Sequence, residues 1–223
     1  QTYQLLALKG DVVPEGYRDK VVETIIDDIK NRDYHLNTGI IGTKYLWPFL
    51  VNEGFEDVAF RIATQTTYPG YGYWIENGFT TLPEEWAGKN SHNHQMFGSI
   101  VEYFYKNLAG IQSPVEGRTS IGYKKIYIEP VIPEGLEWVE GSIETVSGTI
   151  KSGWRKEGSS LYHNVTIPAN TTAVIVLPGN NNVKVREDDT IIWENNNFLV
   201  FGEGITNVKI LSGKLEITVG SGE

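Results

Sequence analysis

Residues 18–31 read RDKVVETIIDDIKN, and this stretch decides the fold of the first half of the chain. Its apolar residues, among them Val22, Ile25 and Ile29, recur at spacings of three and four. Charged residues such as Lys20 and Asp27 occupy the other faces. A single apolar stripe of this kind predicts an amphipathic helix that packs against a core.

Helical patterns continue on both sides of this stretch. Residues 1–9 predict a helix that ends at Gly10, because glycine commonly stops helices. Further helices are expected over residues 45–51, around residues 58–63, and over residues 97–108. Short loops between successive helices are typical of antiparallel helical hairpins. Because the chain begins inside a helix without a cap, we expect it to be a fragment, and its lack of a signal peptide says nothing about export.

From about residue 113 the pattern changes to alternation and turns. Strands are expected at residues 127–130, 162–167, 173–177, 198–201, 208–210 and 215–219. Turn-forming runs such as 178–182 and 212–213 separate them. Short strands at this spacing predict an antiparallel β-sandwich. The sequence therefore predicts an α+β chain with two domains, a helical one over residues 1–112 and a β-sandwich over residues 113–223.

Composition excludes several classes of function. The 223 residues carry a formal net charge of −9, which argues against a nucleic-acid partner. No run approaches the roughly 20 apolar residues of a membrane-spanning helix, so membrane insertion is not expected. The chain has no cysteine, which removes disulfides, thiolate nucleophiles and cysteine-ligated zinc. The lack of cysteine does not fix the compartment, and a periplasmic or secreted location remains compatible with it.

The connection over residues 68–86, YPGYGYWIENGFTTLPEEW, combines aromatic, acidic and glycine residues. Long connections in compact domains tend to be functional. Aromatic rings can stack on the C–H face of a sugar, while carboxylates bind hydroxyls or act as acid and base. Glu84 is either a solvated loop charge or a catalytic carboxylate. Glu85, its neighbour, is not expected to complete a catalytic pair, so a second acid must come from elsewhere.

Two histidines follow in the run Ser91-His92-Asn93-His94. We interpret Ser91 or Asn93 as a helix cap and the histidines as surface groups near it. Two histidines two positions apart do not share a helix face, so no metal site is expected. No serine lies in a nucleophile elbow. The sequence predicts no metal and no cofactor.

Several segments, in order along the chain, resemble motifs of bacterial α-L-rhamnosidases, glycoside hydrolase family 78. They are LNTGIIGTKYL at 36–46, YPGYGY at 68–73, GFTTLPEEW at 78–86, Asn93-His94 followed by FGS at 97–99, GYK at 122–124, and VTIPANTTA at 165–173. The sequence departs from the family pattern at Pro83, where the family has Trp, and at Glu85, where it has Arg. Both departures bear on sugar preference more than on reaction class.

The resemblance implies the last helices of an (α/α)6 barrel that removes terminal L-rhamnose with inversion. It implies that Glu84 is the general base and that Tyr71, Trp86 and His94 bind the sugar. The family's general acid lies N-terminal to all of these segments. The rest of a parent chain would then supply the remaining barrel, and this chain by itself should be inactive or nearly so.

Two other functions remain open at this point. One is a different (α/α)6-barrel enzyme, such as a hydrolase or phosphorylase for another sugar or a polysaccharide lyase. The other is a non-catalytic carbohydrate-binding fragment. In the β half, Trp138, Trp154 and Trp193 could form a sugar-binding face, but tryptophans scattered through a sandwich are more often packing residues.

Overall fold

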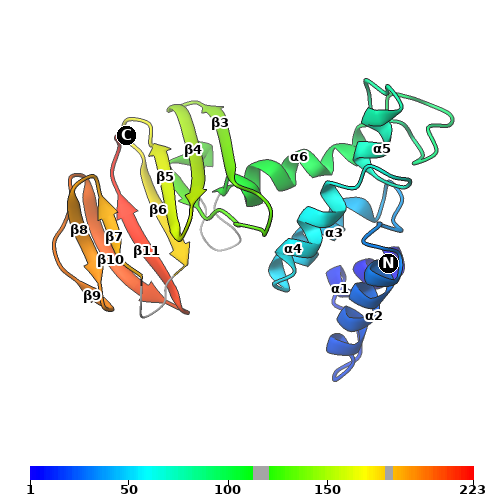
Figure 1. Ribbon diagram of the computed structural model, residues 1–223, viewed down its shortest axis with the longest axis horizontal. Helices are drawn as coiled ribbons and strands as arrows, with labels where there is room; N and C mark the ends of the chain where they lie inside the picture. Colours follow the sequence, from blue (N-terminus) through cyan, green and yellow to red (C-terminus); the bar gives the residue numbers. More distant parts are fainter. Residues whose placement is uncertain (113–120, 179–182) are drawn as a thin grey trace. The chain divides into compact units, whose positions relative to one another are not determined.

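The computed structural model describes residues 1–112, 121–178 and 183–223. It separates into two compact units, residues 1–103 and residues 104–223, the first built from helices and the second mainly from strands (Figure 1). The predicted domain boundary at residue 112 adjoins residues 113–120, which lie outside the described part, and it stays a prediction. No helix in the described ranges is long and apolar enough to cross a bilayer.

The first unit contains seven helical elements. They are α1 (Thr2–Lys9), α2 (Arg18–Asn31), α3 (Thr43–Asn52), α4 (Glu56–Ala63), α5 (Tyr71–Glu76), the 3₁₀ turn η1 (Gln95–Gly98) and α6 (Ser99–Tyr103). Helix α3 lies at the centre and packs against α1, α4 and α6. The stripe of α2 is buried as predicted, at Val22, Ile25, Ile26 and Ile29.

Two helical predictions need correction. The expected continuous helix over residues 97–108 is instead three short pieces: η1, α6 and the π-helical turn η2 (Phe104–Leu108). The expected connection over residues 68–86 contains α5, so it is not irregular throughout. Tyr71 and Trp74 on this short helix are buried, which means that packing rather than length stabilises it.

Three sheets are formed by the described residues of the second unit. The five-stranded sheet has the order β1 (Ile111–Gln112), β2 (Lys125–Ile128), β6 (Thr172–Pro178), β11 (Lys214–Val219) and β10 (Ile205–Leu211). The second sheet consists of β3 (Trp138–Thr145), β4 (Gly148–Glu157) and β5 (Ser160–Thr166), and the third of β7 (Val185–Glu187), β8 (Thr190–Glu194) and β9 (Asn197–Phe198). A 3₁₀ turn, η3 (Ile121–Tyr123), precedes β2. The strand pairs are antiparallel except β2 with β6, which is parallel.

Some strand predictions also need correction. The expected strand over residues 198–201 is wrong, since only Asn197–Phe198 pairs as β9. The sequence analysis does not predict strands β1, β3, β4, β7 and β8. Residues 179–182 of the expected turn lie outside the described residues.

The residues that the structure describes in the second unit pack around two apolar cores. Ile126, Ile128 and Ile150 belong to the first, and Ile192 and Leu215 to the second. Side chains from β6 and β11 pack against both cores, so the five-stranded sheet contributes to each. Trp154 and Trp193 are buried, as the packing interpretation predicts, whereas Trp138 is exposed.

A largely buried histidine on β5, His163, faces Ser152 on β4. His163 Nε2 is 3.0 Å from Ser152 Oγ, and the Ser152 hydroxyl donates to the Ala109 carbonyl at 2.6 Å. Because the serine hydrogen is already used, the His163 Nε2–H must be the donor to Ser152. His163 Nδ1 is buried without a hydrogen-bond partner. Burial lowers the pKa of His163 from 6.5 to about 4.

Because its pKa is lowered in the folded chain, His163 should reduce the free energy of unfolding in acid. Its pKa is lower in the folded chain, so the unfolded chain binds more protons below the ordinary histidine pKa. The stabilisation is fully present above that value and is lost as the pH falls toward 4. Between about pH 7.5 and about pH 5, we expect His163 to reduce the free energy of unfolding by about 2 kcal/mol. Urea unfolding followed by tryptophan fluorescence measures this change.

The matched variants are His163→Gln and His92→Gln. Glutamine at 163 keeps an N–H donor for Ser152 but does not titrate, so the pH dependence should decrease. Removal of the exposed His92 should leave the wild-type dependence. An unchanged pH dependence in His163→Gln would contradict the assignment.

Candidate active site

A hairpin-like loop over residues 82–94 carries the two polar residues of the candidate site. The Glu84 N–H donates to the Ser91 carbonyl at 2.7 Å, and the His94 N–H donates to the Leu82 carbonyl at 2.8 Å. These bonds join the two ends of the loop, because each arm contributes one donor and one acceptor. Glu84 and His94, ten positions apart in sequence, are therefore held side by side.

The side chains of Glu84 and His94 face one another. His94 Nε2 lies 4.0 Å from Glu84 Oε2, and the side chains are 24% and 38% exposed respectively. This separation is too long for a direct hydrogen bond. The Ser91 N–H approaches Glu84 Oε2 at 3.4 Å. His94 Nδ1 is buried and has no hydrogen-bond partner among the described residues.

The tip of the hairpin is closed by its own polar contacts. The Asn90 side-chain amide donates to Glu85 Oε1 at 2.6 Å, and the Gly88 N–H donates to the Glu85 carbonyl at 2.9 Å. His92 Nε2 donates to the Gly88 carbonyl at 2.9 Å, and its ring lies 5.3 Å from the ring of Phe79. Glu85 thus takes part in closing the turn.

An aromatic cluster lies beneath the hairpin and consists of Tyr71, Trp74, Trp86 and Phe97. The Trp74 and Trp86 rings stack at 4.5 Å, and the Tyr71 ring meets Trp86 edge-on at 5.1 Å. Phe97 contacts both indoles. Such ring geometries are favourable beyond the area that they bury.

Each polar group of this cluster donates to a backbone carbonyl. The Tyr71 hydroxyl donates to Phe97 O at 2.7 Å, Trp74 Nε1 to Trp86 O at 2.8 Å, and Trp86 Nε1 to Thr38 O at 2.7 Å. Burial raises the pKa of Tyr71 above its usual range, so this hydroxyl remains protonated. The cluster therefore connects α5, η1, the hairpin and the segment over residues 36–39.

The four site residues that the sequence predicts form two pairs, one accessible to solvent and one buried. Glu84 and His94 come together with polar atoms that solvent can reach. Tyr71 and Trp86 also come together, but they are only 8% and 9% exposed and their polar atoms are used within the fold. Pro83, which precedes Glu84, is buried.

A cavity of about 580 Å³ lies beside Trp86. It is lined by Arg32, His35, Leu36, Asn37, Thr38, Gly39, Tyr68, Pro69 and Trp86. Segments 36–39 and 68–69 fall within the family-like motifs, so sequence reasoning had a signal for them. Arg32 and His35 gave none, because they belong to the end of α2 and to the segment after it.

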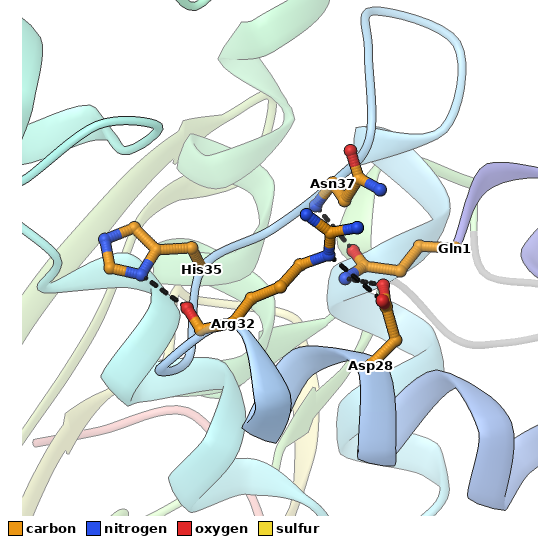
Figure 2. Close-up of polar contacts among 5 residues, drawn as sticks. All are labelled: Gln1, Asp28, Arg32, His35 and Asn37. Atoms are coloured by element: carbon orange, nitrogen blue, oxygen red, sulfur yellow. Dashed lines mark hydrogen bonds and ion pairs between the residues drawn. The ribbon is translucent and has the colours of Figure 1, made fainter.

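A polar network orients the wall of this cavity (Figure 2). The Asp28 carboxylate accepts from Arg32 Nε at 3.0 Å and from the Gln1 amide at 2.9 Å, while Gln1 Oε1 accepts the Asn37 N–H at 2.7 Å. His35 Nδ1 donates to the Arg32 carbonyl at 2.8 Å. Arg32, which lines the cavity, is therefore held in place by a carboxylate.

A second cavity, of about 300 Å³, is lined by Asn77, Gly78, Phe79, Thr80, Thr81 and His92. Glu84 and His94 line neither cavity. In the part of the chain that the structure describes, no group of three His, Asp or Glu residues could hold a common metal ion.

Two family models match the chain. Residues 1–108 match the bacterial alpha-L-rhamnosidase 6 hairpin glycosidase domain, and residues 110–191 match the bacterial alpha-L-rhamnosidase C-terminal domain. The chain belongs to the bacterial α-L-rhamnosidase family. This result confirms the resemblance inferred from the motifs, and it identifies the helices of the first unit as part of a six-hairpin domain.

Individual rhamnosidases agree with this result. An alpha-L-rhamnosidase of Formosa agariphila is 30% identical over 95% of this chain and 24% of its own length. The structure of alpha-L-rhamnosidase from Dictyoglumus thermophilum has a TM-score of 0.83 at 33% identity, covering 99% of this chain and 24% of that one. The Streptomyces avermitilis alpha-L-rhamnosidase complexed with L-rhamnose has a TM-score of 0.81 at 28% identity, covering 99% and 21%. The chain thus spans about a quarter or less of these rhamnosidases.

Gly88 provides a test of the hairpin geometry. Its φ is +69°, and a Cβ there would lie 2.3 Å from Phe79 Cζ, whereas Gly78 has a φ of +76° and no atom within 4 Å of its Cβ position. Gly78→Ala should cost about 1 kcal/mol, from left-handed backbone strain alone. Gly88→Ala should cost about 1 kcal/mol more, because the alanine methyl displaces the Phe79 ring.

Thermal or urea unfolding of the two variants measures this difference. Gly78→Ala is the matched control, since it adds the same methyl group at a similar backbone angle. Equal losses in the two variants would mean that the close approach of Gly88 to Phe79 does not constrain the loop.

Proposed function

We propose that this chain forms the base-bearing part of an inverting glycoside hydrolase that removes terminal α-L-rhamnose, with Glu84 as the general base. The observation that carries the proposal is the hairpin that holds a solvent-accessible Glu84 carboxylate 4.0 Å from His94. Membership of the rhamnosidase family and the relative solved in complex with L-rhamnose support the choice of sugar.

Glu84 is suited to accept a proton from water. Its backbone is fixed by the bond to Ser91, while its side chain is 38% exposed. In an inverting reaction, the deprotonated water attacks the anomeric carbon and forms the new C–O bond as the old glycosidic bond breaks. A general acid protonates the leaving oxygen. The two carboxyl groups must be about 6.5–9.5 Å apart to admit the water.

In this proposal the general acid comes from a part of the barrel outside this chain. Glu85 is not the partner, because its carboxylate accepts the Asn90 amide in the hairpin turn. The substitution of Glu85 for the family's Arg therefore changes the turn rather than the catalytic pair. The catalytic pocket is completed only by the remaining hairpins.

His94 provides the second contact for an oxygen atom at Glu84. An oxygen placed between the two side chains can accept from Nε2–H and donate to Glu84 Oε2, because one such atom bridges a gap of 4.0 Å. This arrangement requires the Nε2–H tautomer. The buried Nδ1 then carries a lone pair instead of an unpaired N–H. The oxygen belongs either to the attacking water or to a sugar hydroxyl.

Tyr71 and Trp86 affect substrate binding mainly by holding the surrounding segments in place. The edge of Trp86 forms part of the wall of the 580 Å³ cavity, and Tyr71 packs against Trp86. Because Trp86 is two residues from Glu84, its bond to Thr38 also fixes the arm of the hairpin that carries the base.

The direct test replaces Glu84 by Gln in a protein that carries the complete barrel. We expect the turnover of an aryl α-L-rhamnoside to fall by about a hundred- to ten-thousandfold, which is the usual effect of removing a general acid or base. The matched control is Glu85→Gln, whose activity should stay within a few-fold of the wild type. An active Glu84→Gln variant would rule out the base assignment. Turnover of a different aryl glycoside would instead favour another barrel glycosidase.

Two further results are expected from the same assay. Proton NMR of the wild-type reaction should show β-L-rhamnose as the first product, because inversion converts an α-glycoside into the β-anomer. The 223-residue chain alone should give little or no product, since it lacks the general acid. A first-formed α-anomer would mean retention, and normal turnover by the chain alone would place both acids within it.

A further inference from the structure

The outer face of the sheet β3–β4–β5 carries an aromatic row. Trp138 on β3 is the direct cross-strand partner of Arg155 on β4, and Arg155 is the partner of Tyr162 on β5. Trp138 is 64% exposed and Tyr162 is 44% exposed. Large aromatic side chains are usually more buried than this. The row runs across all three strands of the sheet.

The alternation of each strand keeps these side chains on one face. Residues 138, 140, 142 and 144 of β3 are exposed, while the residues between them are partly buried. On β4, the opposite face buries Ile150, Ser152 and Trp154. The Trp154 indole donates to the Leu108 carbonyl at 2.7 Å. The row therefore lies on a sheet whose other face is fixed in the core.

Arg155 fills the space between the two aromatic residues. Its guanidinium lies 4.3 Å from the centre of the Tyr162 ring, and its Nε donates to Glu157 at 2.7 Å. An arginine held by a carboxylate and by a ring loses little further freedom when it binds a ligand. Its remaining N–H groups are suited to donate to hydroxyl oxygens.

The next row of cross-strand partners, Glu140, Gly153 and Asn164, forms a shallow depression with a polar side chain on each side. Gly153 is paired with Glu140 on one side and with Asn164 on the other. Since Gly153 has no side chain, the surface is low between these two polar residues. A Cβ at Gly153 would lie 3.3 Å from Glu140 Cγ. The face thus presents flat rings beside a shallow space with a carboxylate and an amide.

We propose that this face binds a neutral glycan chain at a site separate from Glu84. Sugar rings have an apolar C–H face that stacks on indole and phenol rings, and equatorial hydroxyls that bond to carboxylate, amide and guanidinium groups. Trp138 and Tyr162 are two strand spacings apart, about 9.6 Å, which is close to the length of a disaccharide unit. The face carries both acidic groups, Glu140 and Glu157, and basic groups, Lys151 and Arg155, so uncharged hydroxyls suit it better than phosphates or uronates. The inference does not depend on the proposed catalytic function.

The test is affinity electrophoresis of the 223-residue chain through gels that contain a soluble neutral polysaccharide. Two probes are used, a rhamnan and hydroxyethylcellulose. We expect at least one probe to retard the wild-type chain. Trp138→Ala and Tyr162→Ala should each weaken the affinity by about tenfold, as loss of a central aromatic contact usually does. Both side chains are exposed, so circular dichroism should be unchanged.

A matched control separates this face from other surfaces. Tyr3→Ala removes a tyrosine that is 86% exposed on α1 and should be retarded like the wild type. Wild-type mobility that neither probe changes would overturn the proposal. Equal retardation of Trp138→Ala and Tyr3→Ala would also overturn it. A further contrary outcome is that the wild-type chain self-associates in sedimentation without polysaccharide and Trp138→Ala does not, because the face would then bind a second copy of the chain.

Discussion

The helical unit depends on three buried donors that must all reach backbone carbonyls. The side chains of Tyr71, Trp74 and Trp86 belong to the aromatic cluster, and each donates to a carbonyl in a different segment. A buried N–H or O–H left without an acceptor costs about 1–3 kcal/mol. The three hydrogen bonds of the aromatic cluster therefore fix the relative positions of the segments that supply the carbonyls. The hairpin that carries Glu84 takes its position from this arrangement.

Local periodicity explains which elements could be predicted. The stripe of α2 repeats within a few turns, and polar and apolar residues alternate along strands such as β11, so short windows of sequence contain the signal. Strand β3 is not predicted because its inward-facing positions carry only Val139 and Ile143 as large apolar residues, with Gly141 between them. Residues 198–201 were wrongly predicted as a strand because an uninterrupted apolar run does not show whether a partner strand is present.

The candidate site shows a different limit. The grouping of Glu84 with His94 came from the family resemblance, and their backbone pairing across the hairpin could not be read from spacing. Flat aromatic side chains suit both stacking on a sugar and burial in a core, so sequence alone could not separate these two roles for Tyr71 and Trp86. The separation depends on contacts such as the one from Trp86 to Thr38, 48 residues away along the chain.

Strand parity decides the same question in the second unit. Trp138 and Trp154 lie on neighbouring antiparallel strands, and Trp154 is paired with Val139 rather than with Trp138. This shift of one position sends Trp154 into the core and Trp138 to the outer face. A side chain on one face then gains rigidity from the packing of the other, because the strands cannot move without disturbing both. The same principle applies in both units. Buried tryptophans fix the backbone next to side chains that solvent can reach, namely Glu84 in the first unit and the row of Trp138, Arg155 and Tyr162 in the second.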